Sequence, residues 1–341
     1  MSQSTRATIE IVIGLPHLRN GPLLERARAR GYPVLVSANA FSRWDRRAGY
    51  PVWRGWNLNP LANAAGLASL DLDSAGFVLA SRYRGLPWSV DDYVALAASH
   101  PFRRWASLDL CTEQEIAHDR DEVLDRLSRT IALNHACHAR GLDAGIVDNF
   151  MPVLQGRTPH DYLRCLDGVA GLLRGSAVIG IGSMCRRPVH GPEGLLAVFS
   201  ALDRALPRDI RLHGFGVKGT ALSHLAPLAD RIASIDSSAY GVAARREAHA
   251  ARSSKTDVLV ADHMDRWTIS QHQRVKYGRA DFQHQLLLPS PTIASSGWER
   301  ALAVARDEIR SLIEVGEIAH DQITEQWIAS WAAELLDSEN G

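Results

Sequence analysis

The sequence predicts an α/β fold, a TIM (β/α)8 barrel with a C-terminal helical extension, on three observations. Apolar strand-like runs alternate with helix-like stretches eight times between residues 9 and 235, which is typical of a parallel sheet. The length of 341 residues accommodates one barrel of about 250 residues or more. Apolar residues make up 46% of the chain and charged residues 22%, as in globular proteins with a large core. An open, doubly wound sheet is the alternative architecture.

Composition excludes several classes of protein. No apolar run approaches the roughly 20 residues that span a bilayer, so no membrane segment is expected. Residues 1–6 lack an apolar signal-peptide core, and the four cysteines are widely spaced, so we expect a cytoplasmic protein. The 38 basic and 38 acidic side chains balance, so any surface that binds nucleic acid must be local.

The eight predicted strands are short runs of mainly apolar residues between helix-like stretches. They are residues 9–13, 34–36, 68–72, 105–108, 151–154, 177–181, 210–213 and 231–235.

Four of the predicted helices begin where a capping residue or a first-turn proline precedes an amphipathic stretch. The starts are Thr112 (with Glu115 completing a capping box), Thr158–Pro159, Pro192 and Thr220. These helices are expected to end near residues 140, 174, 206 and 229.

Two regions depart from the alternation. Residues 37–66 are rich in turn-forming and aromatic residues, which predicts a long loop over one face of the barrel. From Pro291 onward the pattern is helical, so we divide the chain into a barrel (1–290) and a helical extension (291–341) that packs on the barrel or on a partner. Its two apolar stripes are Leu302, Ala305, Ile309 and Leu312, and Ile323, Trp327, Trp331 and Leu335.

Aspartates follow three of the predicted strands directly: Asp73, Asp109 and Asp236. In a parallel barrel the carboxyl ends of the strands face the active site. A single aspartate in this position is usually a turn or a helix cap, but three on separate strands favour catalysis. Carboxylates gathered in one pocket suit reactions at an anomeric carbon, where one attacks and another moves protons.

The residues at these strand ends resemble the tRNA-guanine transglycosylase superfamily. Asp73-Ser74-Ala75-Gly76-Phe77 is similar to its D-S-G-G-F motif, with alanine at the first glycine. Further similar segments are 109–112 (D-E-C-T), 154–156 (V-Q-G), the glycine-rich 179–182, and 212–216 followed by 235–238. The order and spacing agree over about residues 8–245. Within the superfamily, segments 36–39, 154–156, 182–187 and 212–218 are most similar to the branch of deazapurine DNA modification proteins, DpdA.

This resemblance implies a barrel enzyme that exchanges guanine in DNA for a 7-deazaguanine such as preQ0. It implies that Asp236 is the nucleophile that bonds to C1′ and that Asp73 is the general acid and base. Asp109 would accept hydrogen bonds from guanine N1–H and the exocyclic amine. The O6 edge would be held by Gln155 and the backbone of Gly180 or Gly182.

Further residues of the same motifs are expected to line the base site. They are Ser74, Gly156 and Gly214. Phe77, Trp44 and Tyr240 are candidates for stacking on an extruded base, with a place in the core as the alternative. His213 either contacts the substrate or is held by neighbouring groups.

Basic residues that lie near the predicted mouth are candidates for contacts with phosphates. They are Arg186, Arg187, Arg245, Arg246, Arg274 and Lys276. No acidic residue occurs between residues 266 and 279, although a solvated helix face would also explain this pattern.

The sequence also departs from the superfamily. No cysteine lies beyond Cys185, so the C-x-C-x-x-C zinc motif of the tRNA enzymes is absent; we expect no metal and no cofactor, with replacement of the zinc ligands as the alternative. The alternative functions are base exchange on tRNA, a non-catalytic binding subunit, and an unrelated barrel glycosidase. The expected partners are DNA and a 7-deazaguanine base, while further proteins of a DNA-modification system and a homodimer are left open.

Overall fold

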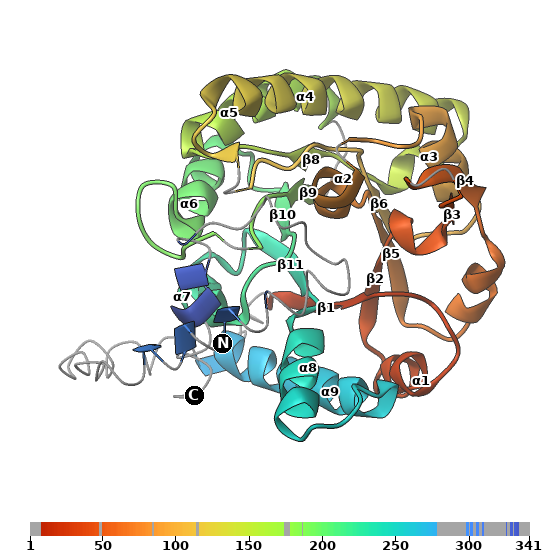
Figure 1. The fold of residues 1–341 in the computed structure, drawn as a ribbon. Helices are drawn as coiled ribbons and strands as arrows, with labels where there is room; N and C mark the ends of the chain where they lie inside the picture. The colour runs from red at the N-terminus through yellow and green to blue at the C-terminus, as the bar shows by residue number, and fades with distance from the viewer. Residues whose placement is uncertain are drawn as a thin grey trace, which may run out of the picture.

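The computed structural model describes residues 8–47, 50–83, 85–113, 116–173, 178–185 and 187–277, and short helical stretches between 298 and 333. Their main body is a parallel barrel wrapped by helices (Figure 1). The strands are β1 (Glu10–Leu15), β2 (Pro33–Ser37), β5 (Ser69–Asp73), β6 (Arg104–Ala106), β7 (Phe150–Met151), β8 (Val153–Leu154), β9 (Val178–Ile181), β10 (Arg211–Gly214) and β11 (Ile232–Ser237).

The sheet closes through a strand that is interrupted by a proline. The strand order is β7-β6-β5-β2-β1-β11-β10-β9-β8, and every pairing in it is parallel. The two end strands, β7 and β8, are consecutive in the chain and are separated only by Pro152, which has no N–H to donate to a ladder. They therefore form one barrel position, and the predicted (β/α)8 architecture is confirmed. Each of the eight predicted strands forms within two residues of its expected bounds.

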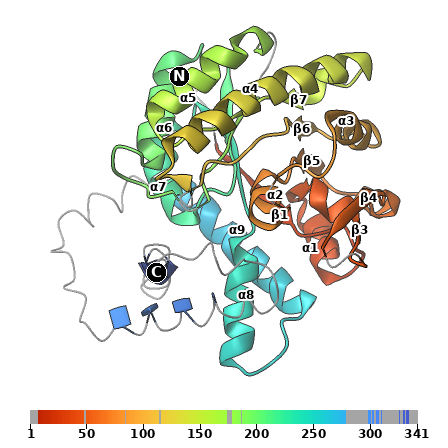
Figure 2. The ribbon, with the colours of Figure 1, turned by 45° about the horizontal axis from the view of Figure 1, so that its top comes forward.

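Helices cover the outer face of the barrel, as Figures 1 and 2 show. They are α1 (Pro22–Arg30), α2 (Gly76–Tyr83), α3 (Val90–Ala98), α4 (Arg120–Asp143), α5 (Pro159–Val169), α6 (Leu195–Ala205), α7 (Leu222–Leu225), α8 (Ala239–Ala250) and α9 (Asp257–Tyr277). Two large apolar clusters lie between sheet and helices. Helix α9 packs against α1, α7 and β1, so it takes the place of the eighth barrel helix, while α8 packs on α9. In the part of the chain described here, no helix is both long and apolar enough to cross a membrane.

The predicted helix starts are partly correct. Thr158 caps α5 in a capping box with Asp161, as expected. The capping box at Thr112 is wrong, because α4 begins at Arg120 with Asp119 as its N-cap. The N–H of Thr112 instead donates to the hydroxyl of Ser183.

Two other helices are shorter than predicted. Helix α6 begins at Leu195 rather than at Pro192. Thr220 lies inside a 3-10 turn, Gly219–Ala221, and α7 ends at Leu225, before Pro227.

The predicted loop over residues 37–66 contains an antiparallel hairpin that the sequence reading missed. Strands β3 (Ser42–Asp45) and β4 (Val52–Trp56) pair between two 3-10 helices, Ala38–Phe41 and Asn59–Ala64. The alternation of tryptophan with charged residues in both strands is a typical signal for a half-buried hairpin.

The described residues of the C-terminal part are helical and have their own apolar cluster. It consists of Ala301, Ala305, Ile309, Ile328 and Ala332, with Trp298, Leu302 and Trp331 packed on it. Leu312, Ile323, Trp327 and Leu335 of the predicted stripes lie outside the described residues. The domain boundary at residue 290 falls there too and stays a prediction.

Candidate active site

Strand ends and strand register bring the three predicted aspartates to the same end of the barrel. Asp73 is the last residue of β5 and pairs with Ser37, the last residue of β2. Asp236 lies next to last in β11, and Asp109 follows β6 by three residues. The negative charges of both Asp109 and Asp236 act on Asp73, so the three carboxylates lie close enough to influence one another.

Asp73 is poised to hold a proton at neutral pH. Burial, followed by repulsion from Asp109 and Asp236, raises the pKa of Asp73 to about 7. Backbone N–H groups of Ala75 and Ser74 oppose this shift, and the Ala75 N–H donates to Oδ2 of Asp73 at 3.1 Å. A carboxyl group with a pKa near 7 can both give and take a proton, as a base-exchange reaction requires.

Asp109 is held by two neutral donors. The hydroxyl of Ser74 donates to Oδ1 and the amide of Gln155 donates to Oδ2. Burial raises the pKa of Asp109, and these hydrogen bonds oppose the shift. Each carboxylate oxygen has a second lone pair, so Asp109 retains acceptors for a ligand.

Two glycines, Gly76 and Gly182, leave room for the side chains of Asp109 and Gln155. A Cβ at Gly76 would lie 2.9 Å from both oxygens of Asp109, and a Cβ at Gly182 would collide with the amide of Gln155. The next residue, Ser183, donates to Oε1 of Gln155 at 2.6 Å and thereby fixes which way the amide points. Glycine is therefore required at both positions by close approach.

Ala75 occupies the position at which the D-S-G-G-F motif has its first glycine. Its φ of 72° lies in the left-handed region, where an alanine is strained by about 1–2 kcal/mol. The chain thus retains the turn between Asp73 and α2 without the residue that adopts it most easily.

A chain of directional hydrogen bonds leads to Asp236. An Arg104 N–H donates to the Ser234 hydroxyl at 3.1 Å; this hydroxyl lies 2.7 Å from His213 Nδ1, and His213 Nε2 lies 3.1 Å from Asp236 Oδ2. An ionised carboxylate only accepts, so Nε2 carries the proton. Arginine only donates, so the Ser234 hydrogen is free to point at Nδ1. His213 therefore donates from Nε2 to Asp236, and the backbone N–H of Gly216 is a second donor at 3.2 Å.

For His213 the sequence leaves two roles open, contact with the substrate or a place held by neighbouring groups. The structure buries it with both ring nitrogens bonded to side chains, those of Ser234 and Asp236, which favours the second role.

A cluster of ion pairs inside the barrel holds Arg104, the first residue of the hydrogen-bond chain that leads to Asp236. The sequence analysis did not predict this cluster. Asp71 binds Arg103 and Arg104, and both arginines also bind Glu10. Burial opposes the ionised form of Asp71, but hydrogen bonds from the two arginines keep its pKa below the usual value. The signal was available, because Asp71 lies two residues before Asp73 and so faces the same side of β5.

Three of the other predicted glycines have packing roles. A Cβ at Gly180 would meet the ring of Phe215 at 2.5 Å, one at Gly156 would meet Asp161, and one at Gly214 would meet Val217. Their part in holding a base stays a prediction.

The three candidate stacking residues differ in exposure. Phe77, on α2, is 41% exposed. Trp44 stacks on Tyr83, with ring centroids 4.0 Å apart. Tyr240 is buried and donates to the carbonyl of Gly14, so it belongs to the core.

The basic residues predicted to contact phosphates differ in exposure. Arg187 is buried and donates to four backbone carbonyls and to the Tyr162 hydroxyl, so it braces the loops rather than facing DNA. Arg186 lies outside the described residues. Arg245 and Arg246 are half-buried on α8, and Lys276 is exposed on α9. Arg274 donates to Gln271, and burial lowers its pKa.

The residues that the structure describes do not fit a zinc site. Among them, no group of three or more His, Cys, Asp or Glu side chains is placed to hold a metal ion. The four cysteines are unpaired by disulfides, and the last of them is Cys185. That the protein uses no metal and no cofactor stays a prediction.

Acids clustered at the carboxyl ends of the strands of a closed parallel barrel are typical of an enzyme that acts at an anomeric carbon. A family model of DpdA, described as DeoxyPurine in DNA protein A, matches residues 32–322, and the chain belongs to this family. Membership gives it a DNA-modification role of the transglycosylase type. No curated protein matches the chain.

Proposed function

We propose that this protein exchanges guanine in DNA for a 7-deazaguanine base through a covalent bond between Asp236 and C1′ of the nucleotide. The observation that carries the proposal is the pairing of unlike acids in one site. Asp236 accepts hydrogen bonds from His213 and the Gly216 backbone, while the pKa of Asp73 is raised so that this group can hold a proton.

In the first half-reaction a carboxylate oxygen of Asp236 attacks C1′ as the bond from C1′ to guanine N9 breaks. Asp73 gives its proton to the departing base and is left ionised. In the second half-reaction Asp73 takes the N9 proton of the incoming deazapurine, whose nitrogen attacks C1′ and releases Asp236. Protons and charges balance over the cycle, and no other reactant is needed. The covalent intermediate predicts ping-pong kinetics.

Guanine recognition falls to Asp109 and Gln155. Asp109 supplies acceptors for the N1–H and the amino group, and Gln155 lies beside it at the O6 edge. Adenine has no donor at N1 and would leave these buried groups unpaired, so the site rejects it. In duplex DNA the target nucleotide must be extruded at a cost of a few kcal/mol.

Labelled guanine tests the proposal directly. The full chain is incubated with labelled guanine and either duplex DNA or tRNA, because attack of labelled guanine on the proposed covalent intermediate would return a labelled base to the nucleic acid. Label that enters DNA supports the proposal, and label that enters tRNA alone contradicts it. No incorporation in either, with binding of DNA retained, would identify a non-catalytic binding subunit.

Asp109→Asn is expected to raise KM for the exchanged base by about 10- to 100-fold, because one buried charged acceptor is lost. Removing the negative charge also lowers the pKa of Asp73, so the alkaline limb of the exchange rate, expected near pH 7, moves to lower pH. The measurement is a pH profile of label exchange. Asp125→Asn, in an exposed helical ion pair, is the matched control and leaves KM unchanged. An unmoved limb in Asp109→Asn would contradict the assigned geometry.

His213→Leu is expected to lower kcat by about 100-fold with little effect on KM, since one donor to the nucleophile is removed and no substrate contact is lost. His213→Gln keeps an N–H near the position of Nε2 and should recover most of the rate. Steady-state kinetics on variants with matched melting temperatures measure this. A rise in KM with kcat unchanged would return His213 to the substrate-binding residues.

A further inference from the structure

Of the arginines that the sequence analysis assigned to DNA, Arg187 and Arg274 are hydrogen-bonded within the protein, whereas a different basic surface is exposed to solvent. Four arginines of the β3–β4 hairpin line a shallow groove: Arg43, Arg46, Arg47 and Arg54. We name these four residues the hairpin arginines. All four are exposed.

The hairpin has an apolar face and a charged face. Trp44 and Trp53 are directly opposed across the two strands. They pack with Trp56 against the large core cluster. The indole N–H of Trp56 also donates to the carbonyl of Asp92 at 2.8 Å. The apolar face of the hairpin is therefore packed on the core and held to α2 by the stacking of Trp44 on Tyr83, and to α3 by the Trp56 hydrogen bond.

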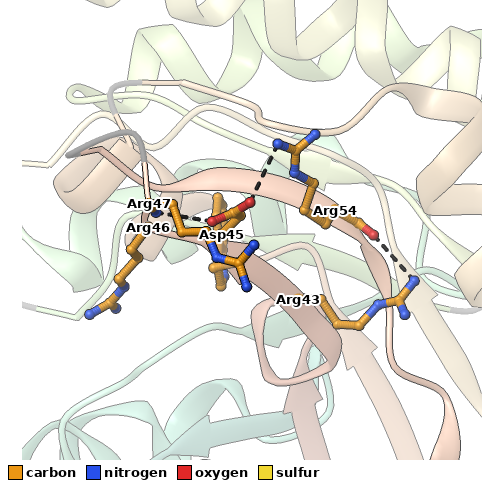
Figure 3. Close-up of a pocket in the computed structure, with 6 residues that line it drawn as sticks. Arg43, Asp45, Arg46, Arg47 and Arg54 are labelled. Atoms are coloured by element: carbon orange, nitrogen blue, oxygen red, sulfur yellow. Dashed lines mark hydrogen bonds and ion pairs between the residues drawn. The ribbon is translucent and has the colours of Figure 1, made fainter.

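The charged face has a large excess of positive charge. Asp45 is the sole acidic residue in the sequence between Glu25 and Asp71. It accepts from the backbone of Arg47 and lies 3.5 Å from an Arg54 nitrogen (Figure 3). One exposed pair of this kind contributes at most about 1 kcal/mol, so it leaves the arginines available to other anions.

The position of the hairpin relates this charge to the candidate active site. The hairpin follows the carboxyl end of β2, whose last residue pairs with Asp73. Trp44 stacks on Tyr83 at the end of α2, and Gly76 at the start of α2 lies against Asp109. Helix α2, which rises roughly 11 Å over the seven steps from Gly76 to Tyr83, therefore connects the hairpin to the candidate active site. Figures 1 and 2 show β3 and β4 beside α3 at the rim of the barrel.

We infer that the hairpin arginines bind the phosphate backbone of DNA beside the extruded guanine. This inference rests on the proposed function and adds the surface that presents the substrate to it. Guanidinium groups suit phosphate oxygens because their planar fork donates two parallel hydrogen bonds. The hairpin, at the rim of the barrel, would hold the DNA strand while the target nucleotide is extruded from the base stack.

Replacing all four hairpin arginines with glutamine tests the inference. Binding of the full chain to a fluorescent duplex is measured by anisotropy over a range of salt concentrations. The slope of log K against log salt is expected to fall by two to four, close to one for each lost phosphate contact. Replacing the four with lysine should restore most of the slope, because the charge returns.

The matched control removes four exposed arginines from the outer helices and a loop, Arg129, Arg164, Arg204 and Arg208, with the same change of net charge. A hairpin variant that binds like this control, while the unmodified protein binds DNA and exchanges guanine, would overturn the hairpin inference alone. An unmodified protein that neither binds DNA nor exchanges guanine would overturn the proposed function as well. A stronger loss of binding to RNA than to DNA would assign the surface to a different nucleic acid and contradict the inference.

Discussion

Asp236→Asn is expected to abolish exchange of labelled guanine, by at least about 10⁴-fold, while binding of DNA stays within twofold of the unmodified protein. An amide oxygen is too weak a nucleophile to displace guanine from C1′. The substitution keeps the shape of the side chain and one oxygen that accepts from His213 and Gly216. The loss should therefore fall on kcat and not on folding or affinity. Rapid-quench measurement of guanine release in a single turnover reports it.

Asp230→Asn is the control for this variant, because Asp230 is exposed and lies just before β11, at the opposite end of the same strand. It should exchange guanine at the normal rate. Normal exchange by Asp236→Asn would show that the nucleophile is another residue.

Asp73→Asn is expected to lower exchange by about 10²- to 10⁴-fold and at the same time to stabilise the folded protein at pH 8. Asp73 has a pKa of about 7 in the folded protein against 3.8 as its ordinary value. Its protonated form is favoured by folding, so the associated stability is complete below about pH 4 and is lost as the pH rises through 7. A neutral asparagine escapes this loss.

The Asp73→Asn variant is expected to gain about 2 kcal/mol of unfolding free energy at pH 8. This is less than the full pKa shift of Asp73 implies, because the Asp73 side chain is partly exposed. Melting curves at pH 4 and pH 8 measure it: the two proteins should differ by a few degrees at pH 8 and hardly at pH 4. A variant that melts lower at pH 8 would show that Asp73 does not lie among like charges.

Much of the barrel is predictable from the sequence because its strands are short apolar runs between amphipathic helices. The positions of Asp73, Asp109 and Asp236 follow from the same pattern, since each ends a strand or nearly so. Helix starts are less predictable: Thr112-x-x-Glu115 has the spacing of a capping box, yet tertiary hydrogen bonding to Ser183 takes Thr112 into the barrel mouth.

The residues that support the aspartates of the site could not be predicted from the sequence. His213 and Ser234 lie on neighbouring strands but 21 residues apart, so nothing local connects them. Arg187 and Arg46 are equally basic in the sequence, and only the fold shows that the first braces loops and the second faces solvent.

The most direct test is to find where DNA becomes attached to the protein. Duplex DNA is mixed with the enzyme without an incoming base, the reaction is quenched in acid, and tryptic peptides are examined by mass spectrometry. The proposed function predicts one released guanine for each adduct, with the deoxyribose carried by the peptide of residues 232–245 at Asp236. An adduct at any other residue, or guanine release with no adduct under conditions of normal exchange, would contradict it.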